Sequence, residues 1–258
     1  MAATRTAWVE RMPIGSLTQS LSILLLQVRN PDDPMRHHEV ESFARVLEVD
    51  VERIGVFDLL NESLTKRHLK EADVMLLGGS GDYSAAGEGE WLERSLDSLR
   101  LVHNHCEPTF ASCWGFQAMA RAMGGHVVHD PSRAEVGTHR LSLTEAAKTD
   151  PLFSPLGESF LGQMGHEDRV DELPRNVTLL ASSEKIPYQA YRFDDAPIYC
   201  TQFHPELNYD DLMRRVQNYP KYIERNAGLP PDRFPELLSE TPGTERLLKR
   251  FVTQFFSD

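Results

Sequence analysis

The first half of the chain alternates short apolar segments with segments of helical periodicity, and this alternation limits the fold more than any other feature. Apolar runs at 22–28, 51–56 and 74–77 are typical of buried strands. Apolar residues recur at helical spacing in 40–47, and the polar stretch 61–72 is also expected to be helical. Strands that alternate with helices form a parallel sheet covered on both faces, with the carboxyl ends of the strands at one edge.

The later part of the chain has a different character. A helix is expected over 91–105 and a strand over 108–111, and short β-like segments separated by Pro, Asp and Gly fill 125–206. Beyond residue 208 the pattern is helical again. We therefore predict an α/β fold, an open, mostly parallel sheet with helices on both faces, extended by antiparallel strands and a C-terminal helical extension. The predicted division is a tail at 1–20, a catalytic domain at 21–207 and the extension at 208–258, packed on the same domain.

Charge and cysteine content exclude several classes of function. The formal net charge of −12 argues against a nucleic-acid partner, because phosphate binding needs clustered Lys and Arg. Three cysteines are too few for a secreted disulfide framework. The apolar run Ile23 to Leu26 is too short for a signal peptide, and no segment approaches the roughly 20 apolar residues that span a bilayer. We expect a cytoplasmic protein without a membrane partner.

One segment has the layout of a nucleophile elbow. A strand ends at Cys113 and a helix begins at once, with small residues at Ala111 and Gly115 where larger side chains would collide with the neighbouring strand and helix. Unpaired N–H groups at the start of the helix favour a reactive thiolate. The Trp114 N–H would face a developing oxyanion. The alternative is an inert buried cysteine, which is common in α/β cores.

A second segment supplies a base. The strand-like residues 198–203 run into His204, and the carboxylate of Glu206 follows two residues later. A cysteine nucleophile needs a base, and the base needs a group that orients it. We predict that His204 accepts the thiol proton and that Glu206 fixes the imidazole tautomer. The alternative is a strand that ends in a proline turn with an exposed acid.

A third segment is the glycine-rich turn 78–82, which directly follows a predicted strand. Its glycines allow the backbone to approach a ligand closely, so its N–H groups could provide a second oxyanion donor. The turn lacks the Gly-Lys-Ser/Thr ending of a phosphate loop and the spacing of a dinucleotide fingerprint. A plain tight turn is the alternative.

Together, in this order, the three segments resemble the Gly-Gly turn, the nucleophile elbow and the terminal His-Pro-Glu of class I glutamine amidotransferases. The resemblance covers roughly residues 23–207, and it implies a flavodoxin-like sheet. Cys113, Gly115 and Gln117 match the family elbow Gly-x-Cys-x-Gly-x-Gln, whereas Ala111 replaces its first glycine and Ser80 replaces a frequent proline. Residues 165–174 resemble a segment of amidotransferase domains of GMP-synthetase type; their alternative is a polar loop.

The resemblance also implies a role for each matching residue. These roles are a catalytic triad of Cys113, His204 and Glu206, an oxyanion hole at Gly79 and Trp114, and substrate-binding positions at Gln117, Ser80 and His166. No cofactor is required. No set of Cys or carboxylate ligands at zinc spacing accompanies the histidine pairs 37/38 and 126/129, so no metal is expected.

The leading hypothesis is hydrolysis of a γ-glutamyl amide, glutamine above all, through a Cys113 thioester. The ammonia would pass to a separate synthetase subunit or leave as product, since no second domain is large enough to use it. A stand-alone γ-glutamyl peptide hydrolase uses the same chemistry. A third hypothesis is a catalytically silent member that binds a partner or a small ligand. Cysteine peptidase-like families of similar fold usually place a histidine directly after the nucleophile, where this chain has Trp114.

Overall fold

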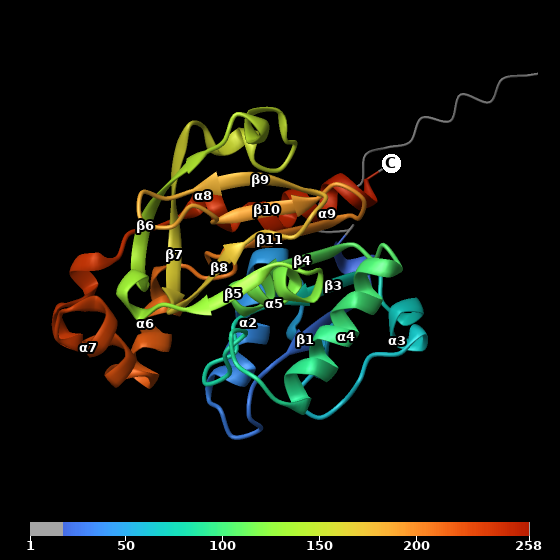
Figure 1. Ribbon diagram of the computed structural model, residues 1–258, viewed down its shortest axis with the longest axis horizontal. Coiled ribbons are helices and arrows are strands. Elements are labelled where there is room, and N and C mark those ends of the chain that lie inside the picture. The colour runs from blue at the N-terminus through green and yellow to red at the C-terminus, as the bar shows by residue number, and fades with distance from the viewer. Residues whose placement is uncertain (1–17, 258) are drawn as a thin grey trace, which may run out of the picture.

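A nine-stranded sheet forms the centre of the protein in the computed structural model, which describes residues 18–257 (Figure 1). Along the sheet the strands are β2 (Ile54–Asp58), β1 (Ile23–Gln27), β3 (Val74–Leu77), β4 (Thr109–Ser112), β11 (Ile198–Thr201), β10 (Ala190–Phe193), β9 (Val177–Ser182), β6 (Glu135–Leu143) and β7 (Ser159–His166).

The direction of the strands divides this sheet into two halves. The five strands from β2 to β11 run parallel to one another, and each strand from β10 to β7 runs antiparallel to its neighbours. The parallel half follows from the helical crossovers in the sequence, because only a long connection returns the chain to the same end of the sheet. The predicted fold class, an α/β sheet with added antiparallel strands, is confirmed.

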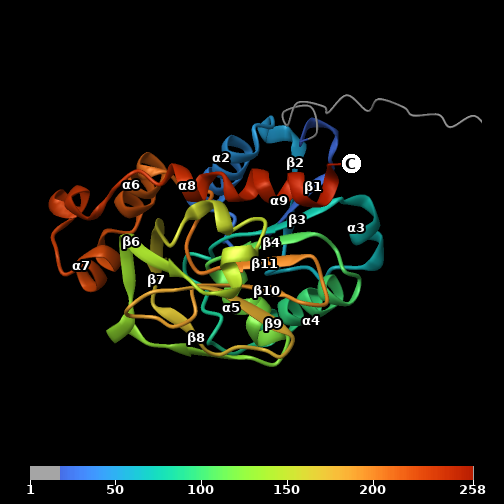
Figure 2. The same ribbon diagram turned by 90° about the horizontal axis from the view of Figure 1, so that it is seen from above.

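Helices cover both faces of the parallel half, as Figure 2 shows with the sheet seen from above. One face carries α2 (Met35–Leu47) and α9 (Leu247–Phe256), and the other carries α3 (Lys66–Glu71), α4 (Glu90–Asn104) and α5 (Trp114–Ala122). Alternate residues of β3 enter the two cores, Leu76 with α2 and α9, and Leu77 with α4 and α5. Such strands, buried on both sides, appear as continuous apolar runs in a sequence.

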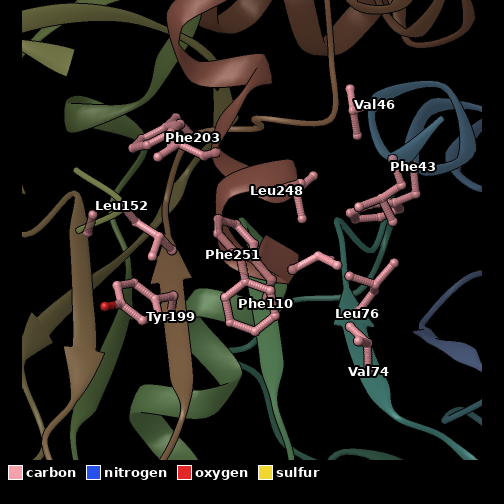
Figure 3. Packing of buried hydrophobic residues seen from close by; sticks show 14 of the residues in the cluster. Phe43, Val46, Val74, Leu76, Phe110, Leu152, Tyr199, Phe203, Leu248 and Phe251 are labelled. Carbon is pink, nitrogen blue, oxygen red and sulfur yellow. The ribbon is translucent and has the colours of Figure 1, made fainter. Parts of the chain in front are cut away.

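Helix α9 is anchored by aromatic side chains that meet the middle of the sheet (Figure 3). Phe251 is fully buried, and its ring centroid lies 5.6 Å from that of Phe110 on β4 and 6.1 Å from that of Tyr199 on β11. The last helix therefore packs on the two strands that precede Cys113 and His204.

The remaining elements surround the carboxyl edge of the sheet or connect the strands. They are β5 (His126–His129) paired with β8 (Asp168–Glu172), the helices α6 (Tyr209–Asn218), α7 (Pro220–Ala227) and α8 (Pro242–Glu245), and the 3-10 helices η1 (Val51–Arg53), η2 (Pro131–Arg133), η3 (Ala146–Thr149), η4 (Ser154–Leu156) and η5 (Pro231–Leu237).

Two expectations concern the ends of the chain and the membrane. The tail predicted for residues 1–20 lies outside the described residues, apart from its last three positions. Between residues 18 and 257, no helix has both the length and the apolar character that crossing a bilayer would require.

Candidate active site

Cys113 occupies a strained turn between β4 and α5. Its backbone has φ 52° and ψ −105°, a left-handed conformation that L residues other than glycine seldom adopt. Such strain typically costs about 1–3 kcal/mol and persists only where the surroundings enforce it. Here the Cys113 N–H donates a hydrogen bond to the Thr201 carbonyl at 2.8 Å, which ties the turn to the end of β11. The sulfur atom is held at the carboxyl edge of the sheet.

Gly115 allows this turn to lie against the neighbouring strand. A Cβ atom at position 115 would lie 2.6 Å from the Leu77 Cβ and 3.2 Å from the Ala111 Cβ. The Gly115 N–H also donates to the Gly78 carbonyl at 3.1 Å, so the elbow and the glycine turn are joined directly. The collision expected from the sequence is therefore a real constraint at Gly115.

Replacing Gly115 with Ala should destabilise the fold by about 1–3 kcal/mol, because the added methyl group overpacks a rigid contact between α5 and β3. Urea unfolding would measure the change. Gly243→Ala is the matched control, since its Cβ would lie 3.5 Å from Leu156 Cδ2, an ordinary contact. Equal stability of the two variants would contradict the proposed constraint.

His204 and Glu206 form a buried pair just beyond β11. The His204 Nδ1 lies 2.6 Å from the Glu206 Oε1, and the two residues are 4% and 0% exposed. The His204 N–H donates to the Gln163 carbonyl at 2.9 Å, which fixes the backbone before the proline turn. A carboxylate this close to Nδ1 selects the tautomer in which Nδ1 carries the proton, so Nε2 is available for chemistry.

The sheet brings this pair to Cys113. Strands β4 and β11 are parallel neighbours, and Thr201 lies opposite Ser112 in the register. Cys113 and His204 line the same cavity. Burial would lower the pKa of His204, but the nearby Glu206 and Cys113 outweigh burial and raise it to about 9. The geometry thus joins thiol, imidazole and carboxylate at one edge.

Arg215 on α6 is a residue of the site that the sequence did not reveal. Its Nη2 lies 3.8 Å from the Glu206 Oε1, and its Nη1 lies 3.4 Å from the His204 Nδ1. Burial would raise the pKa of Glu206, but the charges of His204 and Arg215 hold it below its usual value. One signal was present: Arg215 lies on the buried stripe of α6 with Leu212 and Val216, where an apolar residue is the norm.

The groups predicted for the oxyanion hole lie beside the reacting pair. Trp114 is the first residue of α5, so its N–H has no acceptor within the helix. Gly79 lies against the imidazole, since a Cβ at this position would be 3.3 Å from the His204 Cε1. Both backbone segments border the cavities next to Cys113.

The three predicted substrate-binding side chains all line the smaller cavity, but the protein already engages each of them. Gln117 Nε2 donates to the Asp168 carbonyl at 2.8 Å. The Ser80 hydroxyl donates to the Tyr83 carbonyl. The ring nitrogens of His166 lie 3.0 Å from the Asp168 carbonyl and 3.1 Å from Glu135 Oε2. These contacts shape the wall of the cavity.

Two cavities meet at Cys113. The smaller one, about 220 Å³, is lined by the polar residues of the glycine turn, by α5 and by residues 165–168. The larger one, about 420 Å³, is lined by His204 and by side chains of α6 and α7. Tyr222 of α7 borders both cavities, and its hydroxyl oxygen is buried without a hydrogen-bond partner among the described residues.

A parallel α/β sheet that carries a cysteine on a strained turn and a His–Glu pair after the adjacent strand defines a class of cysteine-bearing α/β proteins. Residues 37–213 match the family model described as glutamine amidotransferase class-I. The chain belongs to the class I glutamine amidotransferase family, as the resemblance predicted.

Relatives and solved structures agree with this assignment. The GMP synthase of Thermosipho africanus is 39% identical over 46% of this chain, and one subunit of the glutamine-hydrolyzing GMP synthase of Pyrococcus abyssi is 31% identical over 55% of this chain and 76% of its own length. The chain spans only 23–33% of the length of three GMP synthases that it matches. A glutamine amidotransferase structure from Thermotoga maritima superposes with a TM-score of 0.71 at 19% identity, covering 92% of this chain and 99% of that one, and supports the fold.

Proposed function

We propose that the protein hydrolyses γ-glutamyl amides, with glutamine as the simplest substrate, through a thioester on Cys113. The observation that carries this proposal is the meeting of Cys113 with the His204–Glu206 pair at one cavity. Family membership supports the same chemistry. No step of the proposed reaction requires a metal or a cofactor.

In the proposed reaction His204 accepts the Cys113 proton and the sulfur attacks the amide carbonyl. The carbonyl oxygen becomes an oxyanion, which the N–H groups at Trp114 and Gly79 would stabilise. His204 then gives its proton to the leaving nitrogen, the C–N bond breaks, and ammonia departs. Water, activated by His204, attacks the thioester, and glutamate leaves as the thiol is restored. Glu206 would stabilise the imidazolium at each stage.

The two cavities suggest how the substrate lies. The leaving nitrogen must face His204, which lines the larger cavity and not the smaller one. The amino-acid end of the glutamyl group would therefore occupy the smaller cavity, whose wall includes Gln117, Ser80 and His166. Those residues would act chiefly by holding the wall in shape, since their polar groups already have partners in the protein.

The destination of the ammonia is a further part of the proposal. Two of the relatives are named as single subunits of a glutamine-hydrolyzing GMP synthase, and such a name implies another subunit that uses the ammonia. We propose that a separate synthetase subunit of this kind is one acceptor, and that release of the amine as product is the alternative. A cytoplasmic location fits the three cysteines, all of which are unpaired in the structure.

Labelling with a glutamine-like electrophile tests the chemistry without any partner. We expect stoichiometric modification of Cys113, located by mass spectrometry and prevented by excess glutamine. The exposed Cys106 and the buried Cys200 serve as internal controls, and neither should show protection by glutamine. A catalytically silent protein would show no such selectivity, and that result would reject the proposed nucleophile.

The pH dependence of catalysis should report the buried triad. The His204 pKa of about 9 lies above its ordinary value of 6.5, so the imidazolium that protonates the leaving amine persists through neutral pH. We expect kcat/KM for glutamine to fall as pH rises through about 9. The stability contributed by this charge is present below pH 6.5 and is lost through the same range.

A variant assigns this alkaline limb. Glu206→Gln removes a charge that raises the His204 pKa, so the limb should move to lower pH. Glu184→Gln, at an exposed position, is the control and should leave the profile unchanged. If the profiles of Glu206→Gln and the wild type coincide, His204 is not the titrating group.

A further inference from the structure

Arg215 is a buried cation without a satisfactory hydrogen bond. The residue is 8% exposed, and its Nε and Nη2 have no hydrogen-bond partner within the described part of the chain. Its Nη1 lies 3.4 Å from the His204 Nδ1, but that nitrogen donates its own proton to Glu206 and has no lone pair to offer. The distance of 3.8 Å to Glu206 Oε1 is too long for a hydrogen bond.

The other buried arginine at this edge differs from Arg215 in its partners. Arg29 is 2% exposed, and its guanidinium contacts Glu39 Oε2 at 3.2 Å and Asp33 Oδ2 at 2.9 Å. Each of its nitrogens therefore has a carboxylate partner. Buried donors left unpaired are costly, and a guanidinium matches a carboxylate with two parallel hydrogen bonds. Arg215 has the chemistry of a site for a carboxylate that the protein itself does not supply.

Arg215 faces the cavity into which the amine would leave. This cavity of about 420 Å³ is lined by both His204 and Arg215. Ammonia resembles water in size and would fill only about 30 Å³ of it. Apolar side chains from α6 and α7 complete the wall, namely Leu212, Val216, Tyr219 and Tyr222. The space fits a leaving group with an apolar part and one negative charge.

The remaining charges around the cavity do not replace Arg215. Arg225 pairs with Glu167, which also accepts a hydrogen bond from Asn226 at 2.7 Å. Asp82 is exposed and negative, so it would repel a carboxylate. Arg215 is thus the lining cation whose donors are free of carboxylate hydrogen bonds among the described residues.

We propose that the larger cavity binds the amine half of a γ-glutamyl amide and that Arg215 binds its carboxylate. The preferred substrates are then γ-glutamyl amides of amino acids or short peptides. This inference rests on the proposed function, because the reaction is the same: the Cys113 sulfur–carbon bond forms, the C–N bond breaks, and the amino acid leaves with the proton from His204. Water then releases glutamate from the thioester.

Three substrates and two variants test the inference. We would measure kcat/KM of the full chain for γ-glutamylalanine, for γ-glutamylethylamide, which lacks only the carboxylate, and for glutamine. Arg215→Met should lower kcat/KM for γ-glutamylalanine about 10- to 100-fold more than for the other two, the usual worth of hydrogen bonds to a charged group. Arg214→Met is the matched control, because Arg214 is on the surface and pairs with Glu41.

The outcomes separate the two proposals. Equal losses for all three substrates in Arg215→Met would overturn carboxylate binding and leave Arg215 as a positioning residue for Glu206. Turnover of glutamine without turnover of γ-glutamylalanine by the wild type would overturn this inference alone. Absence of turnover for every substrate, together with an unlabelled Cys113, would overturn the proposed function as well. Thermal melting confirms that Arg215→Met is folded before its kinetics are compared.

Discussion

Cys113→Ala should lower glutamine turnover by at least about three orders of magnitude while the protein stays folded. The thioester cannot form without the sulfur, and binding and oxyanion contacts alone retain only a small residual rate. The fold should survive because alanine removes a single atom, the sulfur, which lies 3.8 Å from the Gly165 carbonyl at the cavity wall. Ammonia release and circular dichroism measure the two effects.

The control for this substitution is Cys106→Ser, which changes an exposed thiol at a distance from both cavities next to Cys113. It should leave turnover unchanged. Full activity of Cys113→Ala would remove Cys113 from the mechanism, whereas loss of activity together with loss of the circular dichroism signal would indicate a structural role.

Phe251→Ala should lower the free energy of unfolding by about 3–5 kcal/mol. The ring is fully buried and lies between Phe110, Tyr199 and Phe255, at centroid distances of 5.6, 6.1 and 5.0 Å. Alanine would leave a cavity in the centre of one face of the sheet. For a domain of this size the melting temperature should fall by roughly 6–20 °C.

Gln254→Ala on the exposed side of the same helix is the control and should change the stability by less than about 0.5 kcal/mol. The comparison tests whether residues 208–258 pack on the same domain as the catalytic residues, which the sequence predicted. If Phe251→Ala melts at the wild-type temperature, α9 does not contribute to that core in solution.

The parallel strands were predictable because burial on both faces leaves a plain mark in the sequence. The run at 74–77 coincides with β3, and the run at 22–28 contains β1. Helix α4 begins and ends within one residue of the prediction, 91–105. In these elements the local preference of the residues and their burial agree, so periodicity alone located them.

The strands β5, β7 and β8 were not predicted individually, because tertiary packing overrides their local signals. Strand β7 contains Gly162 and Gly165, which normally weaken a strand. Yet a Cβ at Gly162 would lie 2.8 Å from Leu141 Cδ1 and 3.1 Å from the Phe203 Cβ, so the glycine permits close packing. The alternative of a polar loop for 165–174 is wrong for 168–172, which form β8.

The site was predictable as far as short motifs reach. The small residues around Cys113 and the spacing of His204 and Glu206 indicated a common edge, and the register of β4 with β11 places them there. Arg215 and Tyr222 belong to no motif, because they reach the cavities through the path of α6 and α7. A sequence pattern cannot predict how a later helix folds back over an earlier turn.

The adjacency of β4 and β11 has a consequence for how such a protein can change over time. The two strands are direct neighbours, although some eighty-five intervening residues form α5, the antiparallel strands and their connections. That long excursion starts and finishes at the reacting pair without separating it. Insertions, deletions or exchanged loops within the excursion can therefore remodel what the enzyme recognises while the chemistry at its base stays in place.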